Sequence, residues 1–545
     1  MPAKTPIDPL QGPPLALAGR VVVMDEALTV IPHGVLYIAK GSIVGLEEAS
    51  APPPAGFEGV PVVNTGGTLY PGLIELHNHL PYNVLPLWNV PKKFTNRDQW
   101  SGTGDYQKLV SGPMQVVGKT PGLLPAVVRY VEARALLGGV TTSQGVQLFS
   151  NAGVRRFFRG IVRNVEQTDE AALPEAATRV ADVEARDAKL FLARLLKQSC
   201  FLLHLSEGTD ATARKHFLAL QMSDGEWAIS RQLAGIHCAA LHPEDFDVLA
   251  QHQGAMVWSP MSNLLLYGQT ADVKAAKSAG VRIGLGPDWS PSGSKNLLGE
   301  LKVARLVSQA QGGIFTDAEI IAMATRSAAS ILQWQDALGT LEAGKRADVL
   351  VIAGQKSDPY AGLISASETS ISLVMINGVA RYGTPSLMQH LSAKSEKILV
   401  GGHSRMVYFE QTTADPDVEA ISLSEAHERL TQALKTLPDL ASELERPRPP
   451  APAARLGPEP LVWSLALDEI QPTGIDLRPR LPLGARGAPT GPQRLMPLAK
   501  VPLSELVEPI ALSPLTVADD GKFLDQIAAE ANLPAFIKSG LKEFH

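Results

Sequence analysis

The feature that most constrains the fold is a repeated alternation that begins near Gly67. Short apolar runs typical of buried strands are separated by longer helix-like segments, as in TLYPGLIEL, AVVRYVEARALL and GAMVWS. Parallel strands need a crossover of about this length, whereas antiparallel strands can be joined by a tight turn. Eight such units would close a ring, so we predict an α/β fold whose residues 66–340 form a TIM-type (β/α)8 barrel.

The segments on either side of this region have a different pattern. Short alternating β runs precede it, and GTLEAGKRADVLVI and ISLVMINGVARYG follow it. We therefore predict a small β-sandwich domain built from both flanks of the barrel, residues 1–65 and 341–387. Residues 388–545 form a C-terminal extension with a helix-like segment, SLSEAHERLTQALKTL, and a proline-rich linker, RPRPPAPAARLGPEP, in which a helix cannot persist.

Composition limits the kinds of partner. A hydrophobic fraction of 45% fits a globular protein, and 49 Lys and Arg against 55 Asp and Glu leave a net charge of −6, which does not favour nucleic acid. No apolar run near the N-terminus resembles a signal or membrane span. Cys200 and Cys238 lie inside apolar runs, which indicates reduced thiols in the core and not a disulfide framework. We expect a cytoplasmic protein with a small-molecule substrate, and a homo-oligomer is left open.

Side chains that can bind a metal occur at the ends of the predicted strands. His77 and His79 are two residues apart and so point to the same side of an extended chain. His204, His237 and Asp288 each follow a later apolar run. A lone histidine is usually an ordinary core or surface residue, but the C-terminal ends of barrel strands converge on one mouth. Imidazole nitrogens with a carboxylate oxygen there would suit zinc or ferrous iron.

The chain also resembles a known family. Its segments resemble the ordered motifs of the amidohydrolase superfamily, most closely those of the branch with cytosine deaminase and the triazine hydrolases: PGLIELHNHL, HLSEG, HCAAL, SPMSNLLLYG, GLGPDWSPSG and GTLEAGKRADVLVI. The resemblance covers roughly residues 19–383 and implies a barrel flanked by a β-sandwich. It implies that His77, His79, His204 and Asp288 are the metal ligands.

The same resemblance implies the catalytic roles. Glu207 corresponds to a glutamate that shuttles protons, His237 to a histidine that polarises the substrate, and Asp288 to a ligand that also takes the proton of the water. A bound metal lowers the pKa of that water so that hydroxide forms near neutral pH. The run RGIVRNVEQTD lacks the lysine that bridges two metals in other members. We therefore expect one divalent ion, Zn²⁺ with Fe²⁺ as the alternative, although Glu166 could bridge two.

Substrate contacts are sought in the segments that follow the strands. Trp88 and Trp100 lie in a long segment after the first strand, and Gln144 and Arg163 lie near later strand ends. We name Trp88, Gln144 and Arg163 as candidate substrate contacts, against the alternative that they are packed or solvent-facing residues. The predicted function is an amidohydrolase-type, deaminase-like hydrolysis of carbon–nitrogen bonds. The alternatives are another leaving group, such as halide, ester or amide, and a non-catalytic scaffold.

Overall fold

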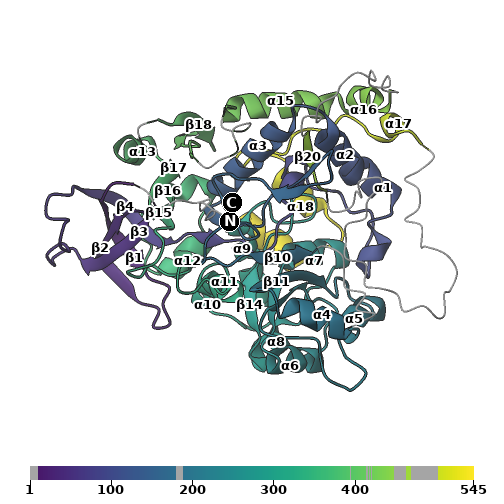
Figure 1. Cartoon of the computed structure of the whole chain (residues 1–545), viewed down its shortest axis with the longest axis horizontal. Coiled ribbons are helices and arrows are strands. Elements are labelled where there is room, and N and C mark those ends of the chain that lie inside the picture. Colours follow the sequence, from purple (N-terminus) through teal and green to yellow (C-terminus); the bar gives the residue numbers. More distant parts are fainter. Residues whose placement is uncertain are drawn as a thin grey trace.

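Three parts of the chain pack together in the computed structural model: a barrel, a large sheet beside it, and an extension that runs back over the barrel (Figure 1). The structure describes residues 10, 12–179, 188–392, 394–412, 415, 418, 420–446, 462–467 and 501–544. The proline-rich stretch predicted to be a linker lies almost wholly outside these residues.

The barrel is built from parallel strands that follow one another in chain order. They form a three-stranded and a five-stranded sheet, and nearly all of their described residues are buried, as in strands covered on both faces. The strands are β5 (Leu73–Ile74), β6 (Val140–Ser143), β9 (Arg163–Asn164), β10 (Ala176–Arg179), β11 (Cys200–Leu205), β12 (Leu233–His237), β13 (Ala255–Trp258) and β14 (Arg282–Leu285).

Backbone hydrogen bonds also cross both junctions between these two sheets. At one junction the amide of Ala176 donates to the carbonyl of Val165 at 2.8 Å. At the other, the amide of Leu76 donates to the carbonyl of Leu285 at 3.2 Å, and Asn78 forms a parallel bridge with Asp288. The order and direction of the strands are those of the predicted TIM-type barrel.

The helices are distributed more regularly among the strands of the second half of the barrel, from β10 onward, than among those of the first half. They are α3 (Leu124–Leu137), α4 (Ala188–Leu195), α5 (Ala211–Leu218), α6 (Pro243–Gln251), α7 (Pro260–Tyr267), α8 (Val273–Ala279), α9 (Leu297–Ala310), α10 (Asp317–Met323) and α11 (Arg326–Leu332).

The expected crossover helix between β6 and β9 is replaced by a hairpin. Its strands are β7 (Gln147–Ser150) and β8 (Arg155–Phe157). A short strand of the extension, β20 (Trp463–Leu465), pairs with β7 and completes a three-stranded sheet. The C-terminal extension therefore covers part of this side of the barrel.

The large sheet has nine strands and takes them from both sides of the barrel. Its order is β18-β19-β17-β16-β15-β4-β1-β2-β3. In Figure 1 the purple N-terminal strands lie beside the green ones from the later sequence. The strands are β1 (Leu15–Val22), β2 (Val30–Ala39), β3 (Ser42–Glu48), β4 (Val62–Pro71), β15 (Val349–Ala353), β16 (Ile371–Ile376), β17 (Val379–Gly383), β18 (Glu396–Val400) and β19 (His403–Val407).

The two flanks meet where β4 pairs antiparallel with β15, Pro71 opposite Val349 and Gly67 opposite Ala353. Two helices follow strands of this sheet, α12 (Pro359–Ile364) after β15 and α13 (Pro385–Leu391) after β17. The last two strands extend the sheet to Val407, beyond residue 387, where the sequence pattern placed the end of the β region.

A buried ion pair joins this sheet to the barrel. The guanidinium of Arg163 in β9 donates to the carboxylate of Asp348, just before β15, at 2.6 Å, and to Asn377 at 2.7 Å. The side chains of Arg163 and Asp348 are 0% and 2% exposed. Arg163, predicted as a substrate contact, therefore has its charge compensated at the boundary between the barrel and the sheet.

The extension contacts the barrel through helices and irregular segments. The predicted helix in this region is present as α15, which packs against α3. Arg129 of α3 donates to the carbonyls of Val418 and Ile421 just before α15, at 2.8 and 3.1 Å. The helices of the extension are α15 (Leu423–Lys435), α16 (Leu437–Glu445), α17 (Leu503–Leu506), α18 (Phe523–Ala529) and α19 (Ala535–Phe544).

Segments at the barrel mouth are shorter and less regular. They comprise the 3₁₀ helices η1 (Leu80–Val84) and η2 (Arg97–Gln99), the turn α1 (Gly104–Tyr106), the π-helical η3 (Gln107–Ser111) and α2 (Gly112–Lys119); a further 3₁₀ helix, η4 (Glu368–Ser370), precedes β16. Over the described residues, none of the helices combines the length and apolar character needed to cross a bilayer.

Replacing Arg163 with methionine tests the buried ion pair. Removing one partner leaves the Asp348 carboxylate buried without its counter-charge, which costs about 3–5 kcal/mol. We expect a clear fall in the midpoint of thermal unfolding. Arg429→Met is the matched control, because Arg429 makes an exposed pair with Glu425 and such pairs contribute about 0–1 kcal/mol. Equal melting curves for the two variants would contradict this role.

Candidate active site

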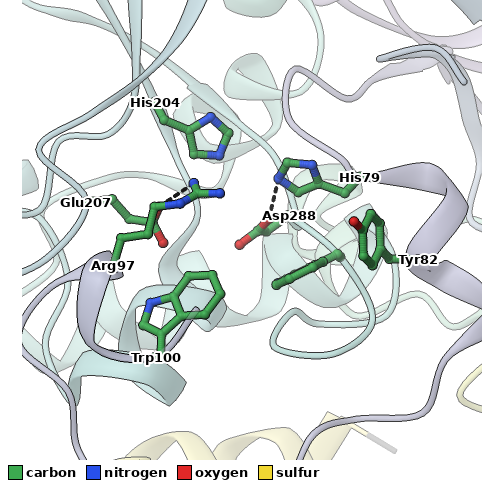
Figure 2. A pocket seen from close by; sticks show the side chains of 8 residues that line it. His79, Tyr82, Arg97, Trp100, His204, Glu207 and Asp288 are labelled. Carbon is green, nitrogen blue, oxygen red and sulfur yellow. Dashed lines mark hydrogen bonds and ion pairs between the residues drawn. The ribbon is translucent and has the colours of Figure 1, made fainter. Parts of the chain in front are cut away.

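A small pocket opens at the mouth of the barrel, where the C-terminal ends of the strands converge. It has an empty volume of about 260 Å³. Figure 2 shows imidazole, carboxylate and guanidinium groups turned toward one another between aromatic rings. The residues that line it are His79, Tyr82, Arg97, Trp100, His204, Glu207, Asp288 and Trp289.

The two histidines of the H-x-H motif meet Asp288 at one edge of this pocket. Oδ1 of Asp288 lies 3.0 Å from Nε2 of His77 and 3.4 Å from Nε2 of His79. The backbones are joined as well: the Asp288 amide donates to the His77 carbonyl, and the His79 amide to the Asp288 carbonyl. Gly286 permits this approach, because a Cβ there would lie 2.5 Å from Cβ of His77.

His204 and His237 enter the same cluster from adjacent strands. His204 is in β11 and His237 ends β12, and the two strands pair in parallel with Leu205 opposite His237. One ring nitrogen from each of His77, His204 and His237 lies within 4.8 Å of the others. The ring centroid of His204 lies 4.7 Å from that of His77, and the ring centroid of His237 lies 5.2 Å from it.

The backbone at several of these strand ends has an unusual conformation. His237 and Asp288 have φ angles of 70° and 67°, and Ser206 has 54°. Positive φ is uncommon for residues other than glycine and persists where the surrounding structure enforces it, often at functional sites. Here it occurs where the chain leaves each strand and the side chain turns into the mouth.

The donor atoms of the cluster fit a divalent metal. Nε2 of His237 is buried and makes no hydrogen bond, although buried polar atoms are normally paired. Separations of 3.0 and 3.4 Å between donors are close to the roughly 3.3 Å expected for a tetrahedral ion with ligand distances of about 2.0–2.1 Å.

The protonation states of these groups also suit a metal. Burial lowers the pKa of His204 well below its usual value and that of His237 to about 3. Burial alone would raise the pKa of Asp288, but the neighbouring His77 and the other imidazoles outweigh it and lower the pKa. Neutral imidazoles and an ionised carboxylate are the forms that bind metal ions.

Other side chains hold these groups from behind. Oε1 of Gln144 accepts the backbone amide of Asn78 at 3.0 Å and lies 3.2 Å from Nδ1 of His77. The hydroxyl of Ser262 donates to Oδ2 of Asp288 at 2.6 Å. Partners of this kind fix the orientation of metal ligands. Gln144, predicted as a substrate contact, lies behind His77, outside the residues that line the pocket.

Glu207 lies across the pocket with both carboxylate oxygens engaged. The hydroxyl of Tyr267 donates to Oε1 at 2.9 Å, and Nη1 of Arg97 donates to Oε2 at 2.9 Å. Nε2 of His237 is 3.9 Å from the same Oε2. The carboxylate of Glu207 thus lies between the histidine cluster and a cation from the segment after the first strand.

Helix α7 brings two of the supporting groups to this side. Asn263 and Tyr267 are four residues apart and therefore share a face of the helix. Nδ2 of Asn263 lies 3.0 Å from Nδ1 of His237, while Tyr267 reaches Glu207. The helix ends at Gly268, whose φ of 64° suits a glycine C-cap.

Sequence reasoning missed part of the pocket wall. Trp100 lines the pocket, whereas Trp88 is buried behind it, with ring centroids 6.5 Å apart. Neither Tyr82 nor Arg97 was singled out, although both follow the H-x-H motif in the same segment as Trp88. Trp289, next to Asp288, could have been found from its place immediately after a strand end.

A barrel that gathers such a cluster at its mouth has the architecture of a metal-dependent hydrolase. The chain belongs to the Amidohydrolase family, whose profile matches residues 68–381. This membership confirms the predicted family and the TIM-type barrel. The chain is an enzyme, a metal-dependent hydrolase of carbon–nitrogen bonds.

Several characterised proteins are similar to this chain. A 5-methylthioadenosine/S-adenosylhomocysteine deaminase from Moorella thermoacetica is 24% identical over 413 residues, 66% of this chain and 93% of that protein. A deaminase of the same name from Desulforudis audaxviator is 29% identical over 195 residues, which are 35% of this chain and 44% of that protein.

Solved structures resemble the fold at lower identity. Atrazine chlorohydrolase from Arthrobacter aurescens TC1, complexed with zinc, has a TM-score of 0.52 at 19% identity, covering 67% of this chain and 94% of its own. Guanine deaminase from Bradyrhizobium japonicum has a TM-score of 0.50 at 16% identity, covering 68% of this chain and 99% of its own.

Gln144→Leu tests the support of His77. Losing the acceptor frees the His77 ring to rotate, so we expect metal affinity to fall by about 10- to 100-fold, measured by competition with a chelator. Gln147→Leu is the matched control, because Gln147 lies three residues further on in β7, outside the cluster. Unchanged affinity in Gln144→Leu would show that the orientation of His77 does not depend on this contact.

Proposed function

We propose that this enzyme deaminates an amino-substituted nitrogen heterocycle, using one zinc ion held by His77, His79, His204 and Asp288. The observation that carries the proposal is the position of Glu207. Its Oε2 lies 3.9 Å from Nε2 of His237, beside a cluster whose donor atoms suit a divalent metal. A carboxylate there can transfer protons to a nitrogen leaving group.

Each side chain has a distinct part in this proposal. The zinc ion would supply Lewis-acid activation of water. Asp288 would accept the proton of the attacking water on a carboxylate oxygen, and Glu207 would pass a proton to the departing nitrogen. His237 would polarise the substrate through Nε2, because Asn263 engages its Nδ1 and its Nε2 lies 3.9 Å from Oε2 of Glu207, which lines the pocket.

The pocket wall supports a flat, ring-shaped substrate. Tyr82, Trp100 and Trp289 line the pocket beside the metal cluster, and Figure 2 shows the rings of Tyr82 and Trp100 at its wall. Flat rings bury well against aromatic side chains through offset or edge contacts. The names of several relatives, adenine- or guanine-type deaminases, agree with an aminoheterocycle.

The metal count is also part of this proposal. Oε2 of Glu166, the alternative bridging ligand, accepts the backbone amide of Gly145 at 2.8 Å. Because the backbone already engages this carboxylate, Glu166 is less suited to bridge two metal ions, which favours a mononuclear site. The zinc named with the chlorohydrolase structure supports zinc over iron.

We also propose a domain organisation and a cellular location for this protein. The flanking segments, residues 1–65 and 341–387, would form a β-sandwich around the barrel of residues 66–340, with residues 388–545 as the extension. The proposal includes a cytoplasmic location and no nucleic-acid partner, supported by composition and charge. These points rest on the sequence pattern and the family resemblance.

The reaction can be identified with a substrate panel. Zinc-loaded enzyme would be incubated with aminopurines, aminopyrimidines and amino-triazines, and ammonia release would be measured. Chlorinated triazines, amides and esters would be assayed in parallel for chloride, amine or acid. Ammonia from at least one aminoheterocycle is expected. Turnover of only the chlorinated or ester compounds would replace deamination by the alternative leaving groups, and a silent zinc-loaded enzyme would favour the scaffold.

Glu207→Gln should keep the metal and lose turnover. Glutamine preserves the shape of the side chain but cannot cycle a proton, and such groups contribute about 10²–10⁴-fold to rate. Asp288→Asn and His204→Ala should instead lower zinc content. Glu166→Gln is the control and should keep both zinc and activity, because an amide oxygen can still accept the Gly145 amide. Full turnover by Glu207→Gln would remove Glu207 from the mechanism.

A further inference from the structure

We propose that the C-terminal clamp, residues 510–533, holds the mouth loop, residues 80–100, in its working position over the active site. In this proposal Ser513 and Asn532 are positioning residues, each of which ties the clamp to the mouth loop at a different point. The clamp lies outside residues 68–381, which match the family.

The mouth loop needs support from outside itself. It leaves the barrel immediately after His79 and supplies Tyr82, Arg97 and Trp100 to the pocket. Its regular structure amounts to η1 and η2, which are short 3₁₀ helices. Long segments with so little internal hydrogen bonding depend on contacts with neighbouring elements for a fixed position.

Ser513 makes the first connection, and all of its polar atoms take part. Its amide donates to the Val84 carbonyl at 3.0 Å, and its carbonyl accepts the Tyr130 hydroxyl at 2.6 Å. Its hydroxyl accepts Nη1 of Arg134 at 3.2 Å and Nζ of Lys295 at 3.1 Å. Ser513 is 2% exposed, so these bonds are shielded from water.

The connection continues from Ser513 to the metal-binding strands. Nη1 of Arg134 also donates to the carbonyl of Asn83 in η1 at 2.6 Å. The side chain of Asn83 donates to Oδ1 of Asn78 at 2.9 Å and accepts the amide of Ser290 at 2.8 Å. Asn78 lies between the two histidines of the H-x-H motif, and Ser290 lies two residues after Asp288. The hydrogen bonds thus lead from the clamp to the Asn78 side chain and to the Ser290 backbone amide, next to the metal cluster.

Asn532 makes the second connection, further along the loop. Its Nδ2 donates to the carbonyl of Lys92 at 3.1 Å and to the carbonyl of Leu265 at 2.9 Å. Leu265 belongs to α7, the helix whose Tyr267 holds Glu207. The Asn532 amide group therefore ties the mouth loop to α7, beside the direct bond from the Phe94 amide to the Leu266 carbonyl at 3.0 Å.

The clamp is itself anchored. Asp520 forms an ion pair with Lys295 at 2.5 Å, and the Val517 amide donates to Oε1 of Glu368 at 2.9 Å. Phe523 and Ile527 of α18 are buried. A segment held by a largely buried ion pair and by buried apolar side chains can transmit a fixed position to the loop that it contacts.

The first experiment compares two serine-to-alanine variants of the full-length, zinc-loaded protein. Ser513→Ala removes the hydroxyl that Arg134 and Lys295 share, while Ser539→Ala removes a local bond within α19. We expect zinc affinity, measured by chelator competition, to fall in Ser513→Ala only, by about tenfold, the lower end of the effect of a direct partner of a metal ligand, because Ser513 acts through Arg134 and Asn83. Equal affinity in both variants would overturn the link to the metal cluster.

The second experiment does not depend on metal or activity. Asn532→Asp keeps the shape of the side chain but presents a carboxylate to two carbonyl oxygens. Hydrogen exchange of residues 80–100 should accelerate by about tenfold, with no change in β11, β12 and β13. Asn532→Asp should also raise KM more than it lowers kcat, because the pocket wall moves while the metal cluster remains.

The two readouts separate this proposal from the proposed function. Unchanged exchange over residues 80–100 would refute the clamp even if the enzyme proved to be a deaminase. Accelerated exchange would support it even if no aminoheterocycle were turned over. Loss of folding in both variants would count against the proposal, because these bonds would then support the whole chain and not the mouth loop in particular.

Discussion

Four imidazole rings and a carboxylate meet at the mouth of the barrel, where all but the half-buried His79 are buried, and much of the surrounding structure serves to hold them there. Buried polar atoms without partners are costly, yet Nε2 of His237 has no hydrogen bond, and the Nε2 atoms of His77 and His79 share a single oxygen of Asp288. Non-glycine residues at two of the strand ends also adopt positive φ. A cation that shared these donors would offset this cost, so metal binding and local stability are expected to be linked.

Much of the metal cluster was predictable because it depends on short-range rules. The H-x-H spacing places His77 and His79 on one side of a strand, and parallel strands bring His204, His237 and Asp288 to the same end of the barrel. The family resemblance then assigned roles to these residues. The role assignments stay predictions, whereas the proximity of the side chains is a property of the fold.

What could not be predicted depends on contacts between segments that are distant in sequence. Arg97 reaches Glu207 only because the mouth loop folds back across the barrel, and Arg163 turns toward Asp348 because the large sheet lies against β9. No local pattern distinguishes an arginine that will meet a carboxylate 185 residues away. The hairpin in place of a helix between β6 and β9 escaped prediction for a similar reason, since β20 supplies part of its pairing.

The pairing of β4 with β15 has a consequence for how the chain is made. During synthesis β4 can pair with β1 at once, but its other edge stays open until residues 349–353 have been made. Open strand edges can pair with other chains, and pairings between distant segments form slowly. The nascent protein therefore carries an unprotected edge throughout synthesis of the barrel, so the step most exposed to aggregation precedes the formation of the complete active site.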